Sequence, residues 1–586
     1  MKPKWTSTPR PYLSITGTTG EGQEAELLLY AQYGDREICK EIQRAKWNPK
    51  RKAWVYPAQP DILQEIKNSF PALTIKADAL GAIQAIADHA EKIKAKKAAG
   101  WEDVTPDSPM PIKNATPFQH QIMGYNLAIA QPSHAMLYEQ GCGKTLTAIA
   151  TIGRRFLDGE ITRVLIVAPA SVVPVWENEF AKFADFPHEV ATLAGMPVKK
   201  RKAALEDMPE PLGVVTDGDM EIVTPLQVAV INYEATWRME EELRDWGPDL
   251  ILCDESQRIK TPGTRQSKGL HNLGRRPKFK LILSGTPVTQ GPLDFFSQYK
   301  FLDPQILGNS YYACRNRYAV MGGYQGYQIV GYRRMDEFMN KVHSISFRVT
   351  KAEALDLPDM IEQELYCELE PKARTAYREL LKESVTELEG ETQITAVNVL
   401  AKLLRLSQMT GGFIGTEEGE IVQASNAKMK LLTETMEDIL GQGKKLVIFA
   451  RFIPEIHAIR KKLEEMKVDY SWIAGEIKME DRGEMVQRFQ EDPECRVFLA
   501  QIQTAGLGIT LHAADTAIFY SLDYSFANLD QAMARLHRIG QKNKVTNIFL
   551  IARDTVDEKV RAALAQKQDV AKAVVDGENW REVFKV

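Results

Sequence analysis

Side chains that could bind and cleave a nucleotide triphosphate stand in the stretch LYEQGCGKT. Gly141 and Gly143 precede Lys144 and Thr145 at the point where an apolar strand pattern gives way to a helical one. Glycines let backbone N–H groups approach phosphate oxygens, a lysine reaches the β and γ phosphates, and a hydroxyl can ligate Mg²⁺. Tyr138 stands where the strict GxxxxGK[ST] pattern has its first glycine, so a structural turn is the alternative. The stretch predicts a site for ATP and Mg²⁺.

Two adjacent carboxylates follow the apolar run in LILCDESQ. Asp254 and Glu255 are expected at the carboxyl end of a buried strand, where ligands bind in open α/β sheets. Asp254 is predicted to hold Mg²⁺ through water, and Glu255 to orient and deprotonate the attacking water. An acidic pair at a strand end is a weak signal alone. Its weight comes from its place between the glycine-rich stretch and LSGTP.

Hydroxyl and guanidinium groups complete the set of residues that phosphoryl transfer needs. Ser284 and Thr286, in LSGTP, could sense the γ phosphate and relay its loss, although an ordinary β-to-α turn is the alternative. Arg535 and Arg538, three residues apart in QAMARLHRIGQ, would project from one face of a helix and could enter a nucleotide site as arginine fingers. Gly508, in the preceding TAGLGITL turn, is expected to contact the nucleotide. Together these stretches predict an ATP-driven motor.

The size and composition of the chain fit a soluble multidomain protein. Its 586 residues should form about three to four units. A net charge of -4 gives no global attraction to nucleic acid, so any such site must be local. The six cysteines show no CxxC pair, which predicts a reducing compartment and no structural metal. The N-terminus lacks a signal-peptide pattern, and no apolar run approaches the roughly 18 residues of a membrane span, so we expect a cytoplasmic protein.

Two series of apolar runs alternate with helical patterns, from 133 to 305 and from 444 to 552. That alternation predicts two doubly wound α/β lobes with parallel sheets. The remaining segments are a small α+β unit, a helical and proline-rich spacer, and a largely helical region with a turn-rich hairpin at GGYQGYQIVGY. The predicted divisions are 1–75 (accessory domain), 76–112 (spacer), 113–305 (first lobe), 306–425 (helical insertion), 426–560 (second lobe) and 561–586 (helical tail).

From about 113 to 560 the chain resembles the Swi/Snf-type ATPases, a branch of the superfamily-two helicases. FQHQIMGYN resembles the adenine-side motif, with Gln121 as its glutamine, and APASVVPVWENEFAKF resembles the segment with a DNA-backbone-contacting serine, here Ser171. SLDYSFANLDQAMARLHRIGQ is the most specific match. The resemblance implies two RecA-like lobes that clamp double-stranded DNA, with ATP between them and the arginine fingers supplied by the second lobe.

This chain departs from the family pattern at two places. Gln257 stands where the family usually has histidine, so the connection from the metal motif to SGT is expected to differ. Tyr524 and Ser525 replace a tryptophan-asparagine-proline pattern, which is expected to alter coupling to DNA without removing it.

The first 75 residues resemble the HARP module of annealing helicases. Basic residues interleaved with aromatic ones in KEIQRAKWNPKRKAWVYP could grip phosphates and stack unpaired bases. The alternative is a solvated hairpin whose tryptophans form a small core, with Trp54 inside. The predicted DNA contacts are Lys46, Trp47, Lys50, Arg51 and Lys52.

The leading hypothesis is a DNA-stimulated ATPase that translocates on duplex DNA and remodels forked, branched or protein-bound DNA. The alternatives are a motor that acts on stalled RNA polymerase and a strand-separating helicase. The expected partners are double-stranded or branched DNA and a replication or transcription protein. A nucleotide-dependent binding protein without turnover is disfavoured because Lys144, Glu255 and both arginines are present. We expect a monomer from a bacterium or phage.

Overall fold

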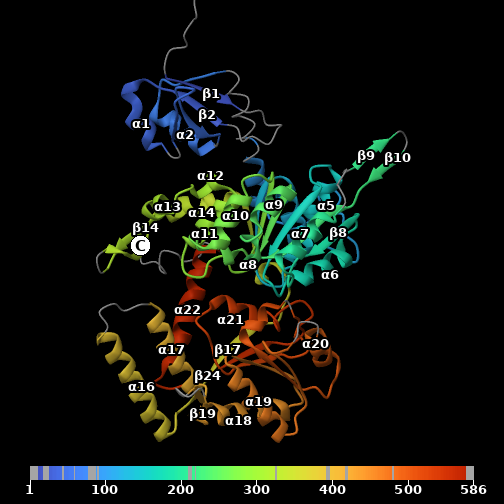
Figure 1. Cartoon of the computed structure of the whole chain (residues 1–586), viewed down its shortest axis with the longest axis vertical. Helices are drawn as coiled ribbons and strands as arrows, with labels where there is room; N and C mark the ends of the chain where they lie inside the picture. Colours follow the sequence, from blue (N-terminus) through green and yellow to red (C-terminus); the bar gives the residue numbers. More distant parts are fainter. Residues whose placement is uncertain are drawn as a thin grey trace, which may run out of the picture.

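The protein is described from a computed structural model of the whole chain. The structure describes residues 11–16, 26–42, 45–58, 60–76, 88, 91–208, 214–217, 220–323, 326–390, 396–415, 420–477, 481–507 and 509–575. Three bodies follow one another along the longest axis, with the N-terminal domain on the side of lobe 1 that faces away from lobe 2 (Figure 1).

The N-terminal domain is a five-stranded sheet packed against two helices, in the order β3-β4-β2-β1-β5. Only β1 and β5 pair in parallel. Its small core includes Leu13, Leu27 and Tyr56, whose hydroxyl donates to the carbonyl oxygen of Cys39 at 2.8 Å. The elements are β1 (Tyr12–Thr16), β2 (Glu26–Tyr30), η1 (Tyr33–Asp35), α1 (Arg36–Glu41), β3 (Lys46–Asn48), β4 (Ala53–Pro57), α2 (Pro60–Ser69) and β5 (Thr74–Ile75).

The C-terminal part of the predicted spacer, within 76–112, packs on lobe 1. The ammonium of Lys97 is buried and donates to the carbonyl oxygen of Ser346 at 2.8 Å, and burial lowers the pKa of Lys97 to about 8. The amide of Asn126 donates to the carbonyl oxygen of Thr105 at 2.8 Å, so the proline-rich stretch is held by side chains of the lobe. Most of 77–90 lies outside the described residues.

Lobe 1 contains a seven-stranded, all-parallel sheet in the order β16-β6-β13-β12-β7-β11-β8. Helices cover both faces, and the central strands therefore consist of apolar residues without alternation. The five apolar runs expected as buried strands between 133 and 305, which are HAMLY, VLIVAP, VAVINY, LILCDE and KLILSGTP, all form strands of this sheet. The strands are β6 (Ser133–Tyr138), β7 (Arg163–Ala168), β8 (His188–Thr192), β11 (Leu226–Asn232), β12 (Leu250–Asp254), β13 (Phe279–Leu283) and β16 (Ser346–Val349).

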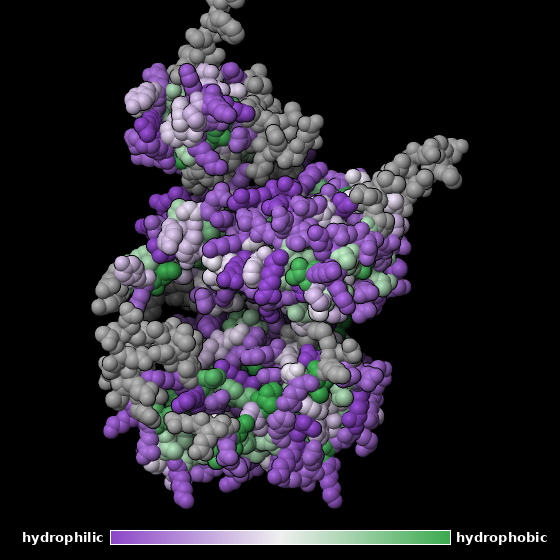
Figure 2. All heavy atoms as spheres, in the orientation of Figure 1, coloured by the Kyte–Doolittle hydropathy of each residue, from purple (hydrophilic) through white to green (hydrophobic). Residues whose placement is uncertain are grey.

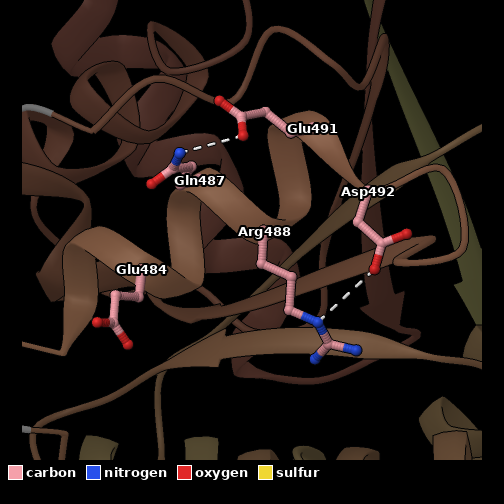
Figure 3. A pocket seen from close by; sticks show the side chains of 5 residues that line it. All are labelled: Glu484, Gln487, Arg488, Glu491 and Asp492. Carbon is pink, nitrogen blue, oxygen red and sulfur yellow. Dashed lines mark hydrogen bonds and ion pairs between the residues drawn. The ribbon is translucent and has the colours of Figure 1, made fainter.

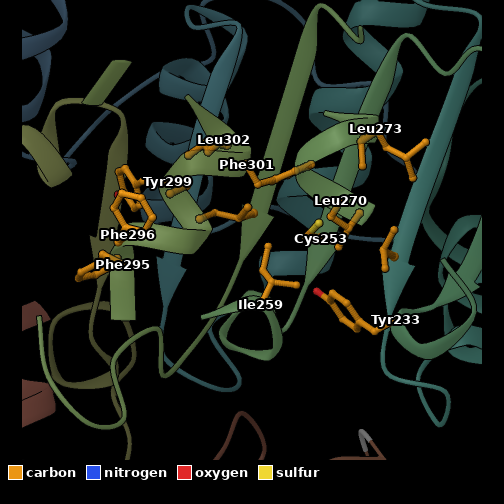
Figure 4. Packing of buried hydrophobic residues seen from close by; sticks show 14 of the residues in the cluster. Tyr233, Cys253, Ile259, Leu270, Leu273, Phe295, Phe296, Tyr299, Phe301 and Leu302 are labelled. Carbon is orange, nitrogen blue, oxygen red and sulfur yellow. The ribbon is translucent and has the colours of Figure 1, made fainter. Parts of the chain in front are cut away.

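The helices of lobe 1 enclose a large apolar core on one face of the sheet. Phe295, Phe296 and Tyr299 on one helix belong to the same buried cluster as Leu270 and Cys253 from neighbouring elements (Figure 4). The helices are α4 (Gln119–Ile129), α5 (Lys144–Leu157), α6 (Val173–Phe183), α7 (Val198–Glu206), α8 (Tyr233–Thr236), α9 (Glu240–Trp246), η2 (Ser256–Ile259), α10 (Arg265–Leu273), α11 (Asp294–Leu302), α12 (Pro304–Leu307), α13 (Tyr311–Tyr318), α14 (Met335–Ser344) and α15 (Lys351–Ala354).

Lobe 2 contains a six-stranded, all-parallel sheet in the order β17-β24-β23-β20-β22-β21. The five apolar runs expected as strands between 444 and 552, which are KLVIFAR, DYSWIAG, CRVFLAQ, TAIFYSL and VTNIFLIA, all form strands of this sheet. The elements are β17 (Met360–Cys367), α16 (Pro371–Gly390), α17 (Ala396–Thr410), α18 (Ala427–Gly441), β20 (Leu446–Ala450), α19 (Ile453–Glu465), β21 (Tyr470–Ile473), α20 (Arg482–Glu491), β22 (Val497–Gln501), η4 (Ile502–Leu507), β23 (Thr516–Phe519), α21 (Phe526–Met533), β24 (Val545–Ala552) and α22 (Val556–Val575).

Two of the predicted boundaries are wrong, because one strand of each sheet lies within the predicted helical insertion, 306–425. β16 pairs in register with β6 and completes lobe 1, so this lobe extends past residue 305. β17 pairs with β24 along eight residues and belongs to lobe 2, although it precedes residue 426. β17 is an edge strand with mostly exposed side chains, MIEQELYC, and therefore lacks the apolar run by which the other strands are recognised. α22 begins before residue 561, and 576–586 lie outside the described residues.

Within the described parts of the lobes, three antiparallel hairpins extend from the sheets and helices. The hairpin predicted in GGYQGYQIVGY is confirmed as β14 (Ala319–Gly322) with β15 (Gln328–Tyr332). The others are β9 (Val214–Asp217) with β10 (Met220–Val223), and β18 (Phe413–Gly415) with β19 (Ile421–Gln423). The visible face of both lobes is mostly hydrophilic, with apolar side chains in small groups (Figure 2). Within the described ranges, no helix is both long and apolar enough to cross a membrane.

Candidate nucleotide site between the lobes

The loop from β6 to α5 has the backbone that a phosphate cradle requires. Gly141 and Gly143 both adopt the left-handed region, with φ of 93° and 76°, which a residue with a Cβ enters only at a cost. Gly143 is the N-cap of α5, so Lys144 and the half-buried Thr145 open the helix. The N–H groups and dipole of a helix N-terminus favour phosphate. We refer to residues 139–145 as the phosphate loop.

Tyr138 stands at the first glycine position of the strict pattern, but it is the last residue of β6 and lies outside the turn. Its ring is fully buried in the core and packs on α4, where a Cβ added to Gly124 would lie 1.6 Å from the phenol oxygen. The side chain therefore points away from the loop, and the departure leaves the cradle intact.

The ammonium of Lys144 is folded back onto its own loop. It donates to the carbonyl oxygens of Tyr138 and Glu139 at 2.9 and 3.3 Å. These are weak, replaceable partners for a buried charge, and the phosphate oxygens of a nucleotide would be stronger ones.

Gln121 lies against the phosphate loop. Its Nε2 donates to the carbonyl oxygen of Gly143 at 3.1 Å, and its Oε1 accepts from the backbone N–H of Phe118 at 2.8 Å. A Cβ added to Gly143 would lie 2.0 Å from that Nε2. The glutamine expected at the adenine is thus in direct contact with the cradle.

Asp254 ends β12, as predicted, and is almost completely buried. The indole N–H of Trp176 donates to its Oδ2 at 3.1 Å, and the hydroxyl of Tyr233 donates to its carbonyl oxygen at 2.7 Å. Burial raises the pKa of the Asp254 carboxyl, the neighbouring Glu255 raises it further, and Lys144 opposes both. A carboxylate that is costly to ionise in this position gains from a cation placed next to it.

The residues present fit Mg²⁺ bound together with a nucleotide. Mg²⁺ usually takes one or two protein oxygens and completes its shell with water and phosphate. Asp254 and the hydroxyl of Thr145 offer that donor set. Among the described residues no group of three or more His, Cys, Asp or Glu side chains could form an all-protein metal cage.

Glu255 has a left-handed backbone, with φ of 53°, and its carboxylate is held at both oxygens. Gln140 Nε2 donates to Oε1 and Gln257 Nε2 donates to Oε2, each at 2.8 Å. Gln257 Oε1 accepts in turn from the hydroxyl of Ser284 at 2.7 Å. The connection from the metal motif to SGT was expected to differ because glutamine replaces histidine at position 257. It is made by the two hydrogen bonds of the Gln257 amide.

Thr286 closes the SGT turn and is buried. Its backbone N–H donates to Ser284 Oγ at 3.2 Å, while its own hydroxyl is buried and has no hydrogen-bond partner among the described residues. A buried hydroxyl without a partner is costly unless a ligand supplies one.

Lobe 2 presents its two arginines to this site. The Cβ of Arg538 lies 3.5 Å from the position of a Cβ built on Gly141, so Arg538 touches the phosphate loop. Arg535 is buried, its pKa is lowered to about 10 by burial and then by Arg538, and Glu255 opposes that shift. α21 ends at Met533, so both arginines lie in the turn after the helix, and the expectation that they share a helix face is wrong.

Comparison with known proteins assigns the chain to a family. Residues 118–411 match the SNF2-related domain, and residues 427–540 match the helicase conserved C-terminal domain. The chain belongs to the SNF2-related family. Both matched ranges lie downstream of the N-terminal domain, so the likeness of that domain to the HARP module stays a prediction.

Several curated relatives cover the SNF2-related part. An uncharacterized ATP-dependent helicase of Mycoplasma pneumoniae is 26% identical over 451 residues, which are 76% of this chain and 40% of that protein. The mouse chromodomain-helicase-DNA-binding protein 1-like is 25% identical over 75% of this chain and 47% of its own length. A zebrafish DNA repair and recombination protein RAD54-like is 26% identical over 76% and 64%. The chain thus spans roughly two fifths to two thirds of these relatives.

Among solved structures, the Sulfolobus solfataricus SWI2/SNF2 ATPase core in complex with dsDNA is 25% identical to the SNF2-related chain. The match covers 82% of this chain and 97% of that one, with a TM-score of 0.36.

A charged cluster within lobe 1, which one residue of lobe 2 approaches, was not predicted from the sequence. Glu139 of the phosphate loop accepts from Arg348 Nη2 at 3.1 Å and from the backbone N–H of Lys351 at 3.0 Å. Asp530 of α21 faces this group from lobe 2; burial raises its pKa to about 6, and Lys351 opposes the shift. Asp530 and Lys351 are far apart in the sequence, and only the tertiary structure brings them together.

Of the two departures from the family pattern, Tyr524 and Ser525, the serine has a local role. Ser525 is the N-cap of α21, where its hydroxyl accepts from the backbone N–H of Asn528 at 3.3 Å. Lys567 of α22 donates to the carbonyl oxygen of Tyr524 at 2.6 Å. Serine therefore begins the helix that leads to the arginines.

Gly508, which was expected to contact the nucleotide, lies outside the described residues.

Ser171 lies in the turn between β7 and α6 of the SNF2-related domain and is half-buried. β7 neighbours β12 in the sheet, so this turn shares the carboxyl edge of the sheet with Asp254. Its predicted DNA contact stays a prediction.

The predicted DNA contacts of the N-terminal domain lie on one hairpin. Lys46 and Trp47 belong to β3, and Lys50, Arg51 and Lys52 form the turn to β4. Trp47 is 52% exposed and meets Trp54 edge to face at 5.5 Å, while Trp54 is partly buried against the domain core. Trp54 therefore packs against the core without being fully buried, and the side chain of Trp47 is exposed.

A surface hollow of about 430 Å³ lies along α20, and no residue of the phosphate loop lines it (Figure 3). It is lined by Glu484, Gln487, Arg488, Glu491 and Asp492. Its single cation, Arg488, already pairs with Asp469 and Asp492. This acidic, self-paired surface does not suit a nucleotide triphosphate.

Proposed function

We propose that this chain hydrolyses ATP between its two lobes, with Mg²⁺, and uses the energy to translocate along double-stranded DNA. The observation that carries the proposal is the contact of Arg538, from lobe 2, with Gly141 of the phosphate loop. A site built from both lobes can couple the γ phosphate to the relative position of the lobes, which a motor requires.

The roles of the site residues follow from their positions. Lys144 would exchange its two backbone carbonyls for the β and γ phosphates. Asp254 and Thr145 would hold Mg²⁺, which shields the phosphate charge when bound. Glu255 would accept a proton from water as the water oxygen bonds to the γ phosphorus. The bond to the β–γ bridging oxygen breaks, and ADP leaves with that electron pair while Arg535 and Arg538 stabilise the departing charge.

Double-stranded DNA is the proposed track. One solved relative is named as a complex with dsDNA, and others are named for DNA repair, recombination and DNA binding. We propose that forked, branched or protein-bound DNA is the remodelled substrate, and that Ser171 contacts the DNA backbone. Phosphate contacts would make binding insensitive to sequence and sensitive to salt.

Replacement of Glu255 tests the hydrolytic proposal. Glu255→Gln keeps the shape of the side chain but cannot accept the proton, so kcat with saturating duplex DNA should fall about 10²- to 10⁴-fold. The affinity for ATP, measured with a fluorescent nucleotide, should change little. Hydrolysis at the wild-type rate would refute the role of Glu255.

We propose that the exposed face of the β3–β4 hairpin adds affinity for forked DNA. Trp47→Ala should weaken binding to a forked duplex more than to a blunt duplex, because only the fork offers unpaired bases to stack. Tyr33→Ala is the matched control, since Tyr33 is an 87% exposed aromatic residue of the same domain, outside the hairpin. Equal losses in both variants would contradict a specific role of the hairpin.

A further inference from the structure

Gln140 of the phosphate loop holds the carboxylate that the proposed function assigns to water activation. Its Nε2 donates to Glu255 Oε1 at 2.8 Å, across the sheet from β6 to β12. Its side chain is 9% exposed. Because this amide is buried and belongs to the phosphate loop, the loop fixes its position.

Gln140 also packs on the SGT turn. A Cβ built on Gly285 would lie 3.0 Å from Gln140 Nε2 and 3.1 Å from its Cγ, which is closer than ordinary packing. The absence of a side chain at Gly285 therefore gives Gln140 room to reach Glu255. If the SGT turn shifts when the γ phosphate is lost, it would therefore displace the amide of Gln140.

The hydrogen bonds form one continuous chain through the site. Ser284 donates to Gln257, Gln257 donates to Glu255 Oε2, and Gln140 donates to Glu255 Oε1. The chain joins the SGT turn, the carboxylate and the phosphate loop. Because two donors from two elements meet one carboxylate, its plane is set by both, and loss of either leaves it held at one oxygen only.

We propose that Gln140 is a positioning residue, which orients the carboxylate of Glu255 toward the attacking water and couples that orientation to the state of the phosphate loop. The inference rests on the proposed function of Glu255. It explains why an amide, with an N–H donor, stands directly before GCGKT. The side chain of Gln140 acts through Glu255 and needs no contact of its own with the water.

The test compares Gln140→Leu, which removes the donor at similar volume, with the exposed control Gln64→Leu in the N-terminal domain. With saturating duplex DNA, Gln140→Leu should lower kcat about ten- to hundredfold, as expected for one lost hydrogen bond to a charged group. The KM for ATP should stay within about twofold, because the phosphate cradle itself is unchanged. Gln64→Leu should match the wild type.

A double-mutant cycle separates positioning from general damage to the site. In the Glu255→Gln background, Gln140→Leu should cause no further loss of single-turnover rate, because a residue that acts through Glu255 has nothing left to orient. An equal additional loss, or an unchanged kcat in the single variant, overturns the inference. The pair of wild type and Glu255→Gln tests the proposed function by itself, so a failure of one is distinguishable from a failure of the other.

Discussion

Adding a single methyl group to the phosphate loop should weaken ATP binding by an amount that the structure defines. In Gly143→Ala the new Cβ would lie 2.0 Å from Gln121 Nε2, at a residue with φ of 76°. The left-handed backbone costs a residue with a Cβ about 1–2 kcal/mol. The hydrogen bond from Gln121 to the Gly143 carbonyl must also break, at about 0.5–1.5 kcal/mol.

The substituted loop would relax away from the left-handed conformation, and ATP binding would have to restore it. The sum, about 1.5–3.5 kcal/mol, corresponds to a Kd for ATP that is about 10- to 400-fold higher. Gly141→Ala has the strain alone, because its Cβ meets Arg538 at an ordinary 3.5 Å, and should raise the Kd about 5- to 30-fold.

Titration with a fluorescent ATP analogue measures both values. Gly159→Ala is the control, since Gly159 also has a positive φ, of 68°, but lies after α5 with no heavy atom within 4 Å of an added Cβ. It should bind ATP like the wild type. If Gly143→Ala bound ATP as tightly as Gly159→Ala, the assignment of this loop as the phosphate cradle would be refuted.

Further predictions concern charge in the lobes. Asp557→Ala should destabilise lobe 2 by about 3–5 kcal/mol in thermal unfolding, because it removes the carboxylate that pairs with the buried ammonium of Lys428. The control is Asp359→Ala, which removes an exposed ion pair and should change the stability little. Equal losses of stability in the two variants would contradict this. Burial raises the pKa of Glu455 to about 7 from 4.5, so the free energy of unfolding should fall by about 3 kcal/mol as pH rises through that window. Urea unfolding of Glu455→Gln should lack that fall, and an unchanged pH dependence would argue against the shift. Lys144→Ala should abolish hydrolysis because it removes charge from the β and γ phosphates, and persistent turnover in the purified variant would refute its role.

The central strands of both lobes were predictable because they are buried on both faces. LILCD, for example, is apolar up to Asp254, and that pattern marks both the strand and its functional end. β17 was missed because one edge of a sheet is exposed and its sequence is polar. Sequence periodicity reports burial, so it fails where a strand is not buried.

The candidate site was predictable as a set of residues, and only partly as an arrangement. Lys144, Asp254 and Glu255 follow from local patterns at strand ends. The approach of Arg538 to Gly141 joins positions far apart in the chain: the spacing of the arginines allowed it, and the family resemblance implied it. The helix expected to carry both arginines ends before them, because a hydrophobic pattern locates helix ends poorly.

Gln140 and Trp176 were not found from the sequence. Each acts on a predicted carboxylate through one hydrogen bond, to Glu255 and to Asp254 respectively, and neither bond has a sequence signature. Gln140 could have been singled out as a polar residue inside a glycine-rich loop, but its partner is fixed by the pairing order of the strands.

The most direct test is ATP hydrolysis measured without nucleic acid and with single-stranded DNA, blunt duplex, forked duplex and double-stranded RNA, each at low and high salt. A DNA-dependent translocase predicts strong stimulation by duplex DNA, further stimulation by the fork, and weakening of both by salt. Absence of stimulation by any DNA would contradict the proposed function and would point to a protein partner such as RNA polymerase.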